Sequence, residues 1–241
     1  MKKDVAIVRL SQQEELIIAT DNSGSIGMKQ ADDVNVPYDV VTYYNFRVAY
    51  MECVAAGATP LSVIVHNFSG DDAWAQFVRG IKRGMQELGI SLEITGSTES
   101  NFTLNQSAVG LVIIGKRPIR ISHPMTYNDQ LEVAVIGKPL VGDEVIDQPE
   151  GIAPLQLFQK LADHPDVVTI QTVGSKGILS ELQQLFSTKT LTFSSTVDLI
   201  KSSGPATCFI IVYEKTLSTH IQNIAGHLLH HVHVSQSMVD K

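Results

Sequence analysis

The sequence contains only two cysteines, Cys53 and Cys208, which lie far apart and each within an apolar stretch. Two isolated thiols have neither the spacing of a zinc site nor the pattern of a disulfide framework. We therefore expect both thiols to be free and buried, as in proteins of a reducing compartment.

The sequence also lacks an excess of basic residues. Its 18 Lys and Arg are outnumbered by 25 Asp and Glu, giving a net charge of −7. This balance argues against nucleic acid or an acidic membrane surface as the main partner. No apolar run is as long as a membrane span, and the first residues, Met1 to Asp4, are unlike a secretory signal. We expect a cytoplasmic protein with no membrane or nucleic-acid partner.

The chain does have enough apolar residues to build a substantial core. Hydrophobic residues make up 44% and charged residues 18% of its 241 residues. This length suits one large domain or two of ordinary size. The segment Gly115-Lys116-Arg117-Pro118 is the best candidate boundary, because the pattern of strands and helices starts again after it. We therefore expect domains at 1–117 and 118–241.

Both halves show the periodicities of strands and of helices. Strands are expected at 5–9, 15–20, 61–67, 92–95, 109–115, 131–136, 167–173, 208–213 and 231–235. Helices are expected at 38–56, 71–88, 152–162, 177–186 and 217–229. The intervening segment 21–37 reads as a long loop, and long loops in compact domains are usually functional or mobile. The sequence therefore predicts a mixed α/β (α+β) protein.

The helix that ends at Gly57 combines small residues with a carboxylate, Glu52. Small residues allow a helix to pack closely on a sheet, and an unpaired carboxylate buried there is costly. A cation such as Mg²⁺ held with a nucleotide is the natural way to neutralise it.

Three polar, glycine-containing segments are candidates for anion binding. The segment 21–27 has an Asp at a strand end before a Gly/Ser loop, whose N–H groups can point at phosphate oxygens; the alternative is a solvated turn. The segment 95–101 has similar chemistry and the same alternative. The segment 173–178 precedes a helix, so it either binds an anion or simply caps the helix.

Four histidines, His227, His230, His231 and His233, lie close together near the C-terminal end of the sequence. Their spacing places them around the end of the helix expected at 217–229 and not on one face of it. No carboxylate or cysteine nearby completes a ligand set. We therefore expect no metal site there.

Several of these segments together resemble one superfamily, that of aminoimidazole ribonucleotide synthetase, thiamine-monophosphate kinase, selenophosphate synthetase and the hydrogenase-maturation dehydratase. The most specific match is Ala55-Ala56-Gly57-Ala58-Thr59-Pro60, with Glu52 where the family usually has Asp. Asp4-Val5-Ala6-Ile7-Val8 resembles the family's N-terminal acidic segment, and Thr20-Asp21 its Thr-Thr-Asp. Thr95-Gly96-Ser97-Thr98-Glu99 resembles its Gly-Gly-Asp/Glu-Thr.

The resemblance continues more weakly in the second half. Val141-Gly142-Asp143-Glu144-Val145 resembles the family's Pro-Gly-Asp segment. Val173 to Ile178 takes the place of Ser-Asp-Gly-Leu, with Lys176 replacing the acid. Ser203-Gly204-Pro205-Ala206-Thr207 takes the place of Gly-Gly-Glu-Asp, and its acids are missing. Because those acids shape the second-substrate site in the family, the substrate is expected to differ from thiamine phosphate.

The resemblance implies two mixed-sheet domains, of which the N-terminal one dimerises and binds ATP with Mg²⁺. It implies metal ligands at Asp4, Asp21, Glu52 and Glu99. It implies nucleotide contacts at Asn22, Gly24, Gly96, Ser97 and Thr98. The general base is not identifiable, and Asp32 and Asp33 are the loop candidates. Lys176 or Arg117 offsets charge in the transition state.

The chain is shorter than most members of the superfamily, and a short, divergent branch of this kind resembles the α-ribazole kinases of cobamide salvage, which phosphorylate a ribose 5′-hydroxyl. We therefore expect an ATP-dependent kinase acting on a nucleoside-like substrate. Two alternatives stay open: an ATP-using ligase or dehydratase, and a nucleotide-binding protein that has lost catalysis.

Overall fold

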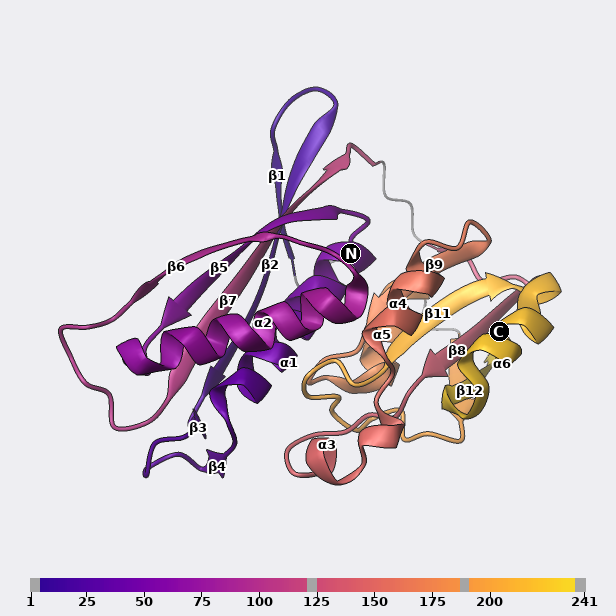
Figure 1. Cartoon of the computed structure of the whole chain (residues 1–241). Coiled ribbons are helices and arrows are strands. Elements are labelled where there is room, and N and C mark those ends of the chain that lie inside the picture. Colours follow the sequence, from indigo (N-terminus) through magenta and orange to yellow (C-terminus); the bar gives the residue numbers. More distant parts are fainter. Residues whose placement is uncertain (1–4, 121–124, 187–190, 237–241) are drawn as a thin grey trace, which may run out of the picture. The chain divides into compact units, whose positions relative to one another are not determined.

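The computed structural model describes residues 5–120, 125–186 and 191–236 (Figure 1). It divides into two compact units, an N-terminal one that ends at Arg120 and a C-terminal one formed by the rest of the chain. Each unit is a five-stranded sheet with helices, which confirms the predicted α/β class. No described helix is long and apolar enough to cross a membrane.

The sheet of the N-terminal unit has the strand order β1-β2-β7-β5-β6. These strands are β1 (Val5–Arg9), β2 (Glu14–Gly24), β5 (Thr59–Asn67), β6 (Glu93–Thr98) and β7 (Ala108–Pro118). Neighbours pair antiparallel except β5 and β6, which are parallel. Two short strands, β3 (Ile26–Gly27) and β4 (Val34–Asn35), pair beside it.

One face of this sheet is covered by α1 (Tyr38–Ala55) and α2 (Trp74–Leu88) (Figure 1). Alternate strand residues, including Ile17, Val63 and Ile113, are fully buried under the helices. Helix α2 follows a short 3-10 turn at Asp71–Ala73 and ends at Gly89, whose positive φ of 67° is the left-handed cap that glycine favours. Both helices were predicted, α2 from its apolar periodicity, and their positions are confirmed.

The opposite face of the sheet carries a second set of apolar residues, which we call the open face. It consists of Leu16, Ile18, Ile64, Val112 and Ile114, all half-buried. Ile18 lies directly opposite Ile114, and Ile64 directly opposite Val112, so the set is continuous across three strands. Neither helix of this unit lies on that face (Figure 1).

The C-terminal unit has the strand order β10-β12-β8-β11-β9, and its neighbours pair antiparallel. The strands are β8 (Leu131–Ile136), β9 (Val167–Thr172), β10 (Leu191–Ser195), β11 (Phe209–Glu214) and β12 (Leu229–Gln236). The helices are α3 (Glu144–Asp147), α4 (Leu155–Ala162), α5 (Gly177–Phe186) and α6 (Ser218–Ala225). Short 3-10 turns lie at Pro149–Gly151, Lys215–Leu217 and Gly226–Leu228.

The core of this unit joins the sheet to α5. Val133, Val135, Ile210 and Val212 pack with Leu182 of the helix, and all are nearly inaccessible to solvent. Cys208 is in the same cluster, and Cys53 is buried in α1 of the other unit. Both thiols are free, as expected, and burial raises the pKa of Cys53 to about 12.

In this unit α3 and β10 were not predicted from the sequence, and the last helix is shorter than predicted. The helix expected at 217–229 ends at Ala225, and the chain then enters strand β12. His230, His231 and His233 therefore lie on a strand and not around a helix end. The prediction that these histidines lie around a helix end is therefore wrong, and because side chains alternate along a strand, His231 and His233 share a face.

Candidate functional site

Polar residues gather at one end of the N-terminal sheet. Strands β2, β5 and β6 run in the same direction, because β2 and β5 are both antiparallel to β7 and β6 is parallel to β5. Their C-terminal ends, at Gly24, Asn67 and Thr98, therefore meet at one edge. This edge holds Asp21 and the segment 25–35, so it is the candidate site.

Asp21 is held in place by a residue of α1. Asn45 donates hydrogen bonds from Nδ2 to Asp21 Oδ2 at 2.7 Å and to Ser23 Oγ at 3.0 Å. Burial raises the pKa of Asp21 to about 6, although hydrogen bonds from Asn45 and from the Asn22 backbone act in the opposite direction. The result is a half-buried carboxylate in a fixed orientation at a strand end.

The oxygen atoms around Asp21 fit a magnesium ion. Asn45 is 1% exposed, and its Oδ1 is a buried atom with no hydrogen-bond partner among the described residues. Carboxylate, amide and hydroxyl oxygens are the hard donors that Mg²⁺ prefers. No three His, Cys, Asp or Glu of the described chain come together as a metal site. Mg²⁺ nevertheless commonly binds through one or two carboxylates together with nucleotide phosphates and water, so the donor set is compatible with it.

The other predicted metal ligands lie in different places. Glu52 is half-buried on α1, two turns beyond Asn45. Glu99 follows β6 and accepts hydrogen bonds from the backbone N–H groups of Asn101 and Phe102, at 2.7 and 3.1 Å. Asp4 lies outside the described residues. The structure therefore gives Glu99 a turn-stabilising contact, and the four-carboxylate set stays a prediction.

The two loop carboxylates predicted as candidate bases have different surroundings. Asp32 is buried and accepts hydrogen bonds from Ser107 N and Ser107 Oγ, both at 2.6 Å, and from Lys29 N at 2.8 Å. Burial alone would raise the pKa of Asp32, but these hydrogen bonds lower it below its ordinary value. Asp33 is exposed and is bonded to Ser25 Oγ. The hydrogen bonds of Asp32 thus hold the loop against Ser107, and Asp33 is the more accessible candidate base.

The segment 25–35 is anchored more firmly than its sequence suggests. Lys29 Nζ donates to the carbonyl of Leu104 at 2.7 Å, and Gln106 Nε2 donates to the Ala31 carbonyl at 2.8 Å. The long loop expected at 21–37 also begins later, because residues 21–24 are paired with β7. Few apolar residues are available to anchor this segment, and its anchors are instead polar contacts to residues more than seventy positions away.

Asn22 and Gly24, predicted to contact nucleotide, are exposed residues at the end of β2. The second predicted phosphate loop is also mostly strand, since β6 continues to Thr98. A Cβ on Gly96 would lie 2.1 Å from the Val65 carbonyl oxygen, so glycine is required there by packing. Ser97 is exposed, and Thr98 Oγ1 accepts a hydrogen bond from Asn67 at 3.1 Å.

The two candidate cations, Arg117 and Lys176, belong to different units. Arg117 is buried in the N-terminal unit, where it pairs with Glu15 at 2.8 Å and donates to the Ala56 carbonyl. Because these contacts hold its guanidinium within the fold, they argue against a role in catalysis. Lys176 is exposed in the C-terminal unit, just before α5.

Asn45, Asn67 and Ser107 were missed in the sequence. Each is buried beside the candidate site and hydrogen-bonded to a neighbouring strand or loop. Asn45 left one detectable signal, because it is a polar residue at a position that helical periodicity places on the buried side of α1. Asn67 and Ser107 end or precede strands, where polar residues are unremarkable in a sequence.

Comparison with known families gives one match. Residues 2–115 match the model described as AIR synthase related protein, N-terminal domain. This match covers most of the N-terminal unit and the whole candidate site, and it supports the superfamily inferred from the motifs. No curated protein sequence matches the chain.

Solved structures similar to this one cover nearly the whole chain at low sequence identity. Thermotoga maritima PurL complexed with ADP matches at a TM-score of 0.61 and 15% identity, over 98% of this chain and 42% of that chain. A chain of the HypE–HypF complex matches at 0.64 and 13% identity, over 98% and 88%. Thiamine monophosphate kinase from Aquifex aeolicus matches at 0.62 and 11% identity, over 97% and 89%.

These likenesses confirm the predicted fold for both units. The chain spans less than half of the length of PurL but most of the length of the other two. The C-terminal half, which lies outside the family match, is therefore tied to the same architecture by structure alone.

Proposed function

We propose that this protein is an ATP- and Mg²⁺-dependent phosphotransferase. The observation that carries the proposal is the Asp21 carboxylate, oriented by Asn45 at a strand end within the segment that matches the family model. Phosphoryl transfer needs positioned charge more than covalent chemistry. A fixed carboxylate surrounded by oxygen donors supplies that positioning for the metal ion of a metal–nucleotide complex.

Residues of the N-terminal unit have different proposed roles in binding the nucleotide. Asp21 would hold the ion, which when bound neutralises charge on the phosphates, and Glu52 and Asp4 are further candidate ligands implied by the family resemblance. Ser97 is exposed at the end of β6 and is free to donate its hydroxyl to a phosphate oxygen. Gly96 serves instead by letting β6 pack closely against Val65.

A nucleoside-like molecule is the proposed phosphoryl acceptor, most specifically the ribose 5′-hydroxyl of α-ribazole. This finer assignment rests on the motif resemblance, and the likeness to thiamine monophosphate kinase supports a kinase. The exposed Asp33 is the proposed base, and Lys176 the proposed cation for transition-state charge. The alternative is an ATP-using ligase or dehydratase, in which the transferred phosphate activates an amide or carbonyl oxygen. The similarity to PurL supports keeping this alternative.

Product analysis separates these possibilities. We expect ATP, Mg²⁺ and α-ribazole to give ADP and a phosphorylated riboside in equal amounts, and we expect Asp21→Asn to abolish both. Release of inorganic phosphate with an amide-forming acceptor would favour the ligase or dehydratase alternative. Binding of ATP without any turnover, across nucleoside and amide acceptors, would indicate a non-catalytic protein.

We also propose that the protein is a homodimer that pairs through the open face of the N-terminal sheet. The apolar segments 61–67 and 109–115 would favour pairing if they were unpaired sheet edges, but they are the interior strands β5 and β7, so an edge argument for the dimer is wrong. The open face supports the same proposal differently, because its half-buried apolar residues lie on a sheet face without a covering helix. Apolar patches of this kind commonly mark protein–protein contacts.

A further inference from the structure

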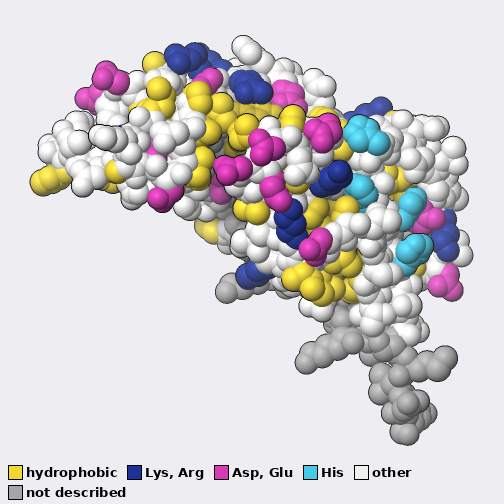
Figure 2. Space-filling model, turned by 90° about the horizontal axis from the view of Figure 1, so that it is seen from below, with side chains coloured by type: hydrophobic (Ala, Val, Ile, Leu, Met, Phe, Trp, Pro, Cys, Tyr) yellow, Lys and Arg dark blue, Asp and Glu magenta, His cyan; other side chains and the backbone are white. Residues whose placement is uncertain are grey.

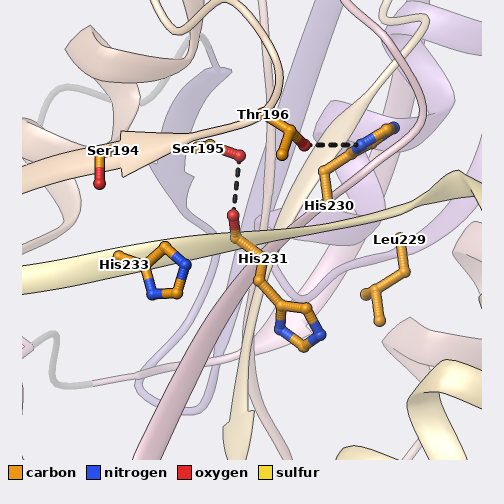
Figure 3. Close-up of a pocket in the computed structure, with 7 residues that line it drawn as sticks. All are labelled: Ser194, Ser195, Thr196, Leu229, His230, His231 and His233. Carbon is orange, nitrogen blue, oxygen red and sulfur yellow. Dashed lines mark hydrogen bonds between the residues drawn. The ribbon is translucent and has the colours of Figure 1, made fainter.

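A pocket of about 380 Å³ lies at the edge of the C-terminal sheet, where β10 meets β12 (Figure 3). Its lining consists of Ser194, Ser195, Thr196, Leu229, His230, His231 and His233. Imidazole and hydroxyl groups therefore dominate a site that the proposed phosphotransferase reaction does not use. Space-filling shows histidine side chains reaching the surface of this unit, among carboxylates and amines (Figure 2).

Strand geometry sorts the three histidines of the pocket. His231 and His233 are two residues apart on β12, so they project from the same face, whereas His230 projects from the other. Figure 3 shows His230 on the opposite side of the strand from His231. His231 and His233 are exposed, and neither ring has a hydrogen bond or an ion pair within the described part of the chain.

The spacing of this pair suits a shared metal ion. Residues two apart on a strand are separated by about 6.7 Å along it. Two imidazoles bound to one ion have metal–nitrogen distances of about 2.0–2.1 Å, which places their ring centres about 5 Å apart. Exposed side chains change rotamer within nanoseconds, so the two rings can turn toward each other without any backbone movement.

The strand itself is held firmly enough to keep the pair in register. β12 is bonded to β8 on one side and to β10 on the other. Ser195 Oγ donates to the His231 carbonyl oxygen at 2.7 Å, and Val232 between the two histidines is 6% exposed in the core. Ser194 lies directly opposite His233, so a hydroxyl is adjacent to the pair.

We propose that His231 and His233 form a two-imidazole chelate for a divalent transition-metal ion such as Zn²⁺, Ni²⁺ or Cu²⁺. Imidazole nitrogen suits these ions, and carboxylate-rich sites suit Mg²⁺, so this site is chemically distinct from the one at Asp21. No third His, Cys, Asp or Glu joins the pair in the described chain. Water, with the neighbouring Ser194 hydroxyl, fills the remaining coordination positions.

Metal titration of the full chain, without any histidine tag, tests the site. Calorimetry should detect Cu²⁺ binding that is lost in the double variant His231→Ala/His233→Ala. Ni²⁺ should bind the same pair more weakly than Cu²⁺, and Mg²⁺ should not bind it. Electron paramagnetic resonance of the Cu²⁺ form should show two nitrogen ligands. His231→Ala and His233→Ala should each weaken binding by about tenfold or more, since each removes one of two ligands.

Two controls distinguish the pair from other histidines. His66→Ala removes an exposed imidazole on β5 of the N-terminal unit, and His230→Ala removes the pocket imidazole on the opposite side of β12; both should bind Cu²⁺ at the His231–His233 pair as the unaltered chain does. Unchanged affinity in the double variant His231→Ala/His233→Ala would overturn the proposal. Loss of binding in His230→Ala, in a variant with unchanged circular dichroism, would also overturn it.

Discussion

Asn45 on α1 donates a 2.7 Å hydrogen bond to the carboxylate of Asp21 on β2. The bond joins a fully buried helix residue to a half-buried strand residue. It fixes the direction of a carboxylate whose burial raises its pKa to about 6. The proposed metal ligand is therefore maintained at a cost in stability, and that cost can be measured.

Asp21→Asn should stabilise the protein at pH 7.5 while abolishing binding of ATP·Mg²⁺. The folded pKa of about 6 exceeds the value of about 3.9 expected in the unfolded chain. The folded state therefore binds the proton more tightly, and this contribution to stability is present at low pH and lost as the pH rises through 6. Removing the charge should raise the free energy of unfolding at pH 7.5 by on the order of 1–3 kcal/mol.

Urea denaturation at pH 4.5, 6 and 7.5 checks the sign of this effect. The difference between Asp21→Asn and the unaltered chain should shrink toward pH 4.5. Asp71→Asn, on an exposed turn of the same unit, serves as the control. Equal stability of the Asp21 variant and the unaltered chain at every pH would show that the Asp21 carboxylate is solvated.

Glu52→Gln should reduce ATP turnover by orders of magnitude while leaving the protein folded. The substitution keeps the shape of the side chain and removes its charge. If Glu52 binds the metal ion, loss of that ligand can cost several kcal/mol at the transition state. Steady-state kinetics provide the measurement, with Glu93→Gln on an exposed part of β6 as the control. An unchanged kcat would assign Glu52 to packing.

Asp32→Ala should loosen the segment 25–35 and lower stability. It removes three hydrogen bonds to an ionised group, and the loss should cost roughly 2–4 kcal/mol. Because these bonds lower the pKa of Asp32, their contribution is present at neutral pH and lost as the pH falls below about 3.9. Amide hydrogen exchange at 25–35 should accelerate in this variant and not in Asp33→Ala.

ATP·Mg²⁺ should slow amide exchange across residues 25–36, if this segment closes over the phosphates. Residues 22–24 are paired with β7 and should already be protected without nucleotide. Added contacts through the metal ion and phosphates would order the remainder. Asp21→Asn should not show this slowing. Equal exchange with and without nucleotide, in a chain shown to bind ATP, would show that residues 25–36 do not close over the phosphates.

Light scattering at micromolar concentration should give the mass of a dimer, and Ile18→Lys should give a monomer. Ile18 is central in the open face, where a buried charge without a partner is costly. Gln86→Lys on the exposed side of α2 should leave the mass unchanged. A monomeric mass for the unaltered chain would contradict pairing through this surface.

The strongly patterned elements were predictable from the sequence. The apolar spacing in α2 predicted a helix, and the β-branched run in β5 predicted a strand. Both elements lie where the patterns placed them. The start of β12 was not predictable, because apolar residues at helical spacing continue from Ile221 through Ile224 to Leu228. The strand expected at 231–235 is present, but only the structure shows that the helix stops at Ala225 and that the strand begins at Leu229.

Within the candidate site, the sequence identified the residue types but could not assign their contacts. Asp32 and Asp33 are adjacent and chemically identical, yet only Asp32 is buried against Ser107. That difference depends on contacts between residues 75 positions apart. The orientation of Asp21 depends in the same way on Asn45, so local patterns contained no information about it.

The two cysteines give the molecule a built-in reporter for each unit. Cys53 and Cys208 are fully buried in different units, and neither is bridged. A thiol reagent reaches such a side chain only after its own unit opens. The rate of alkylation at each thiol would therefore show whether the N-terminal half, which matches the family model, and the C-terminal half unfold together or one at a time.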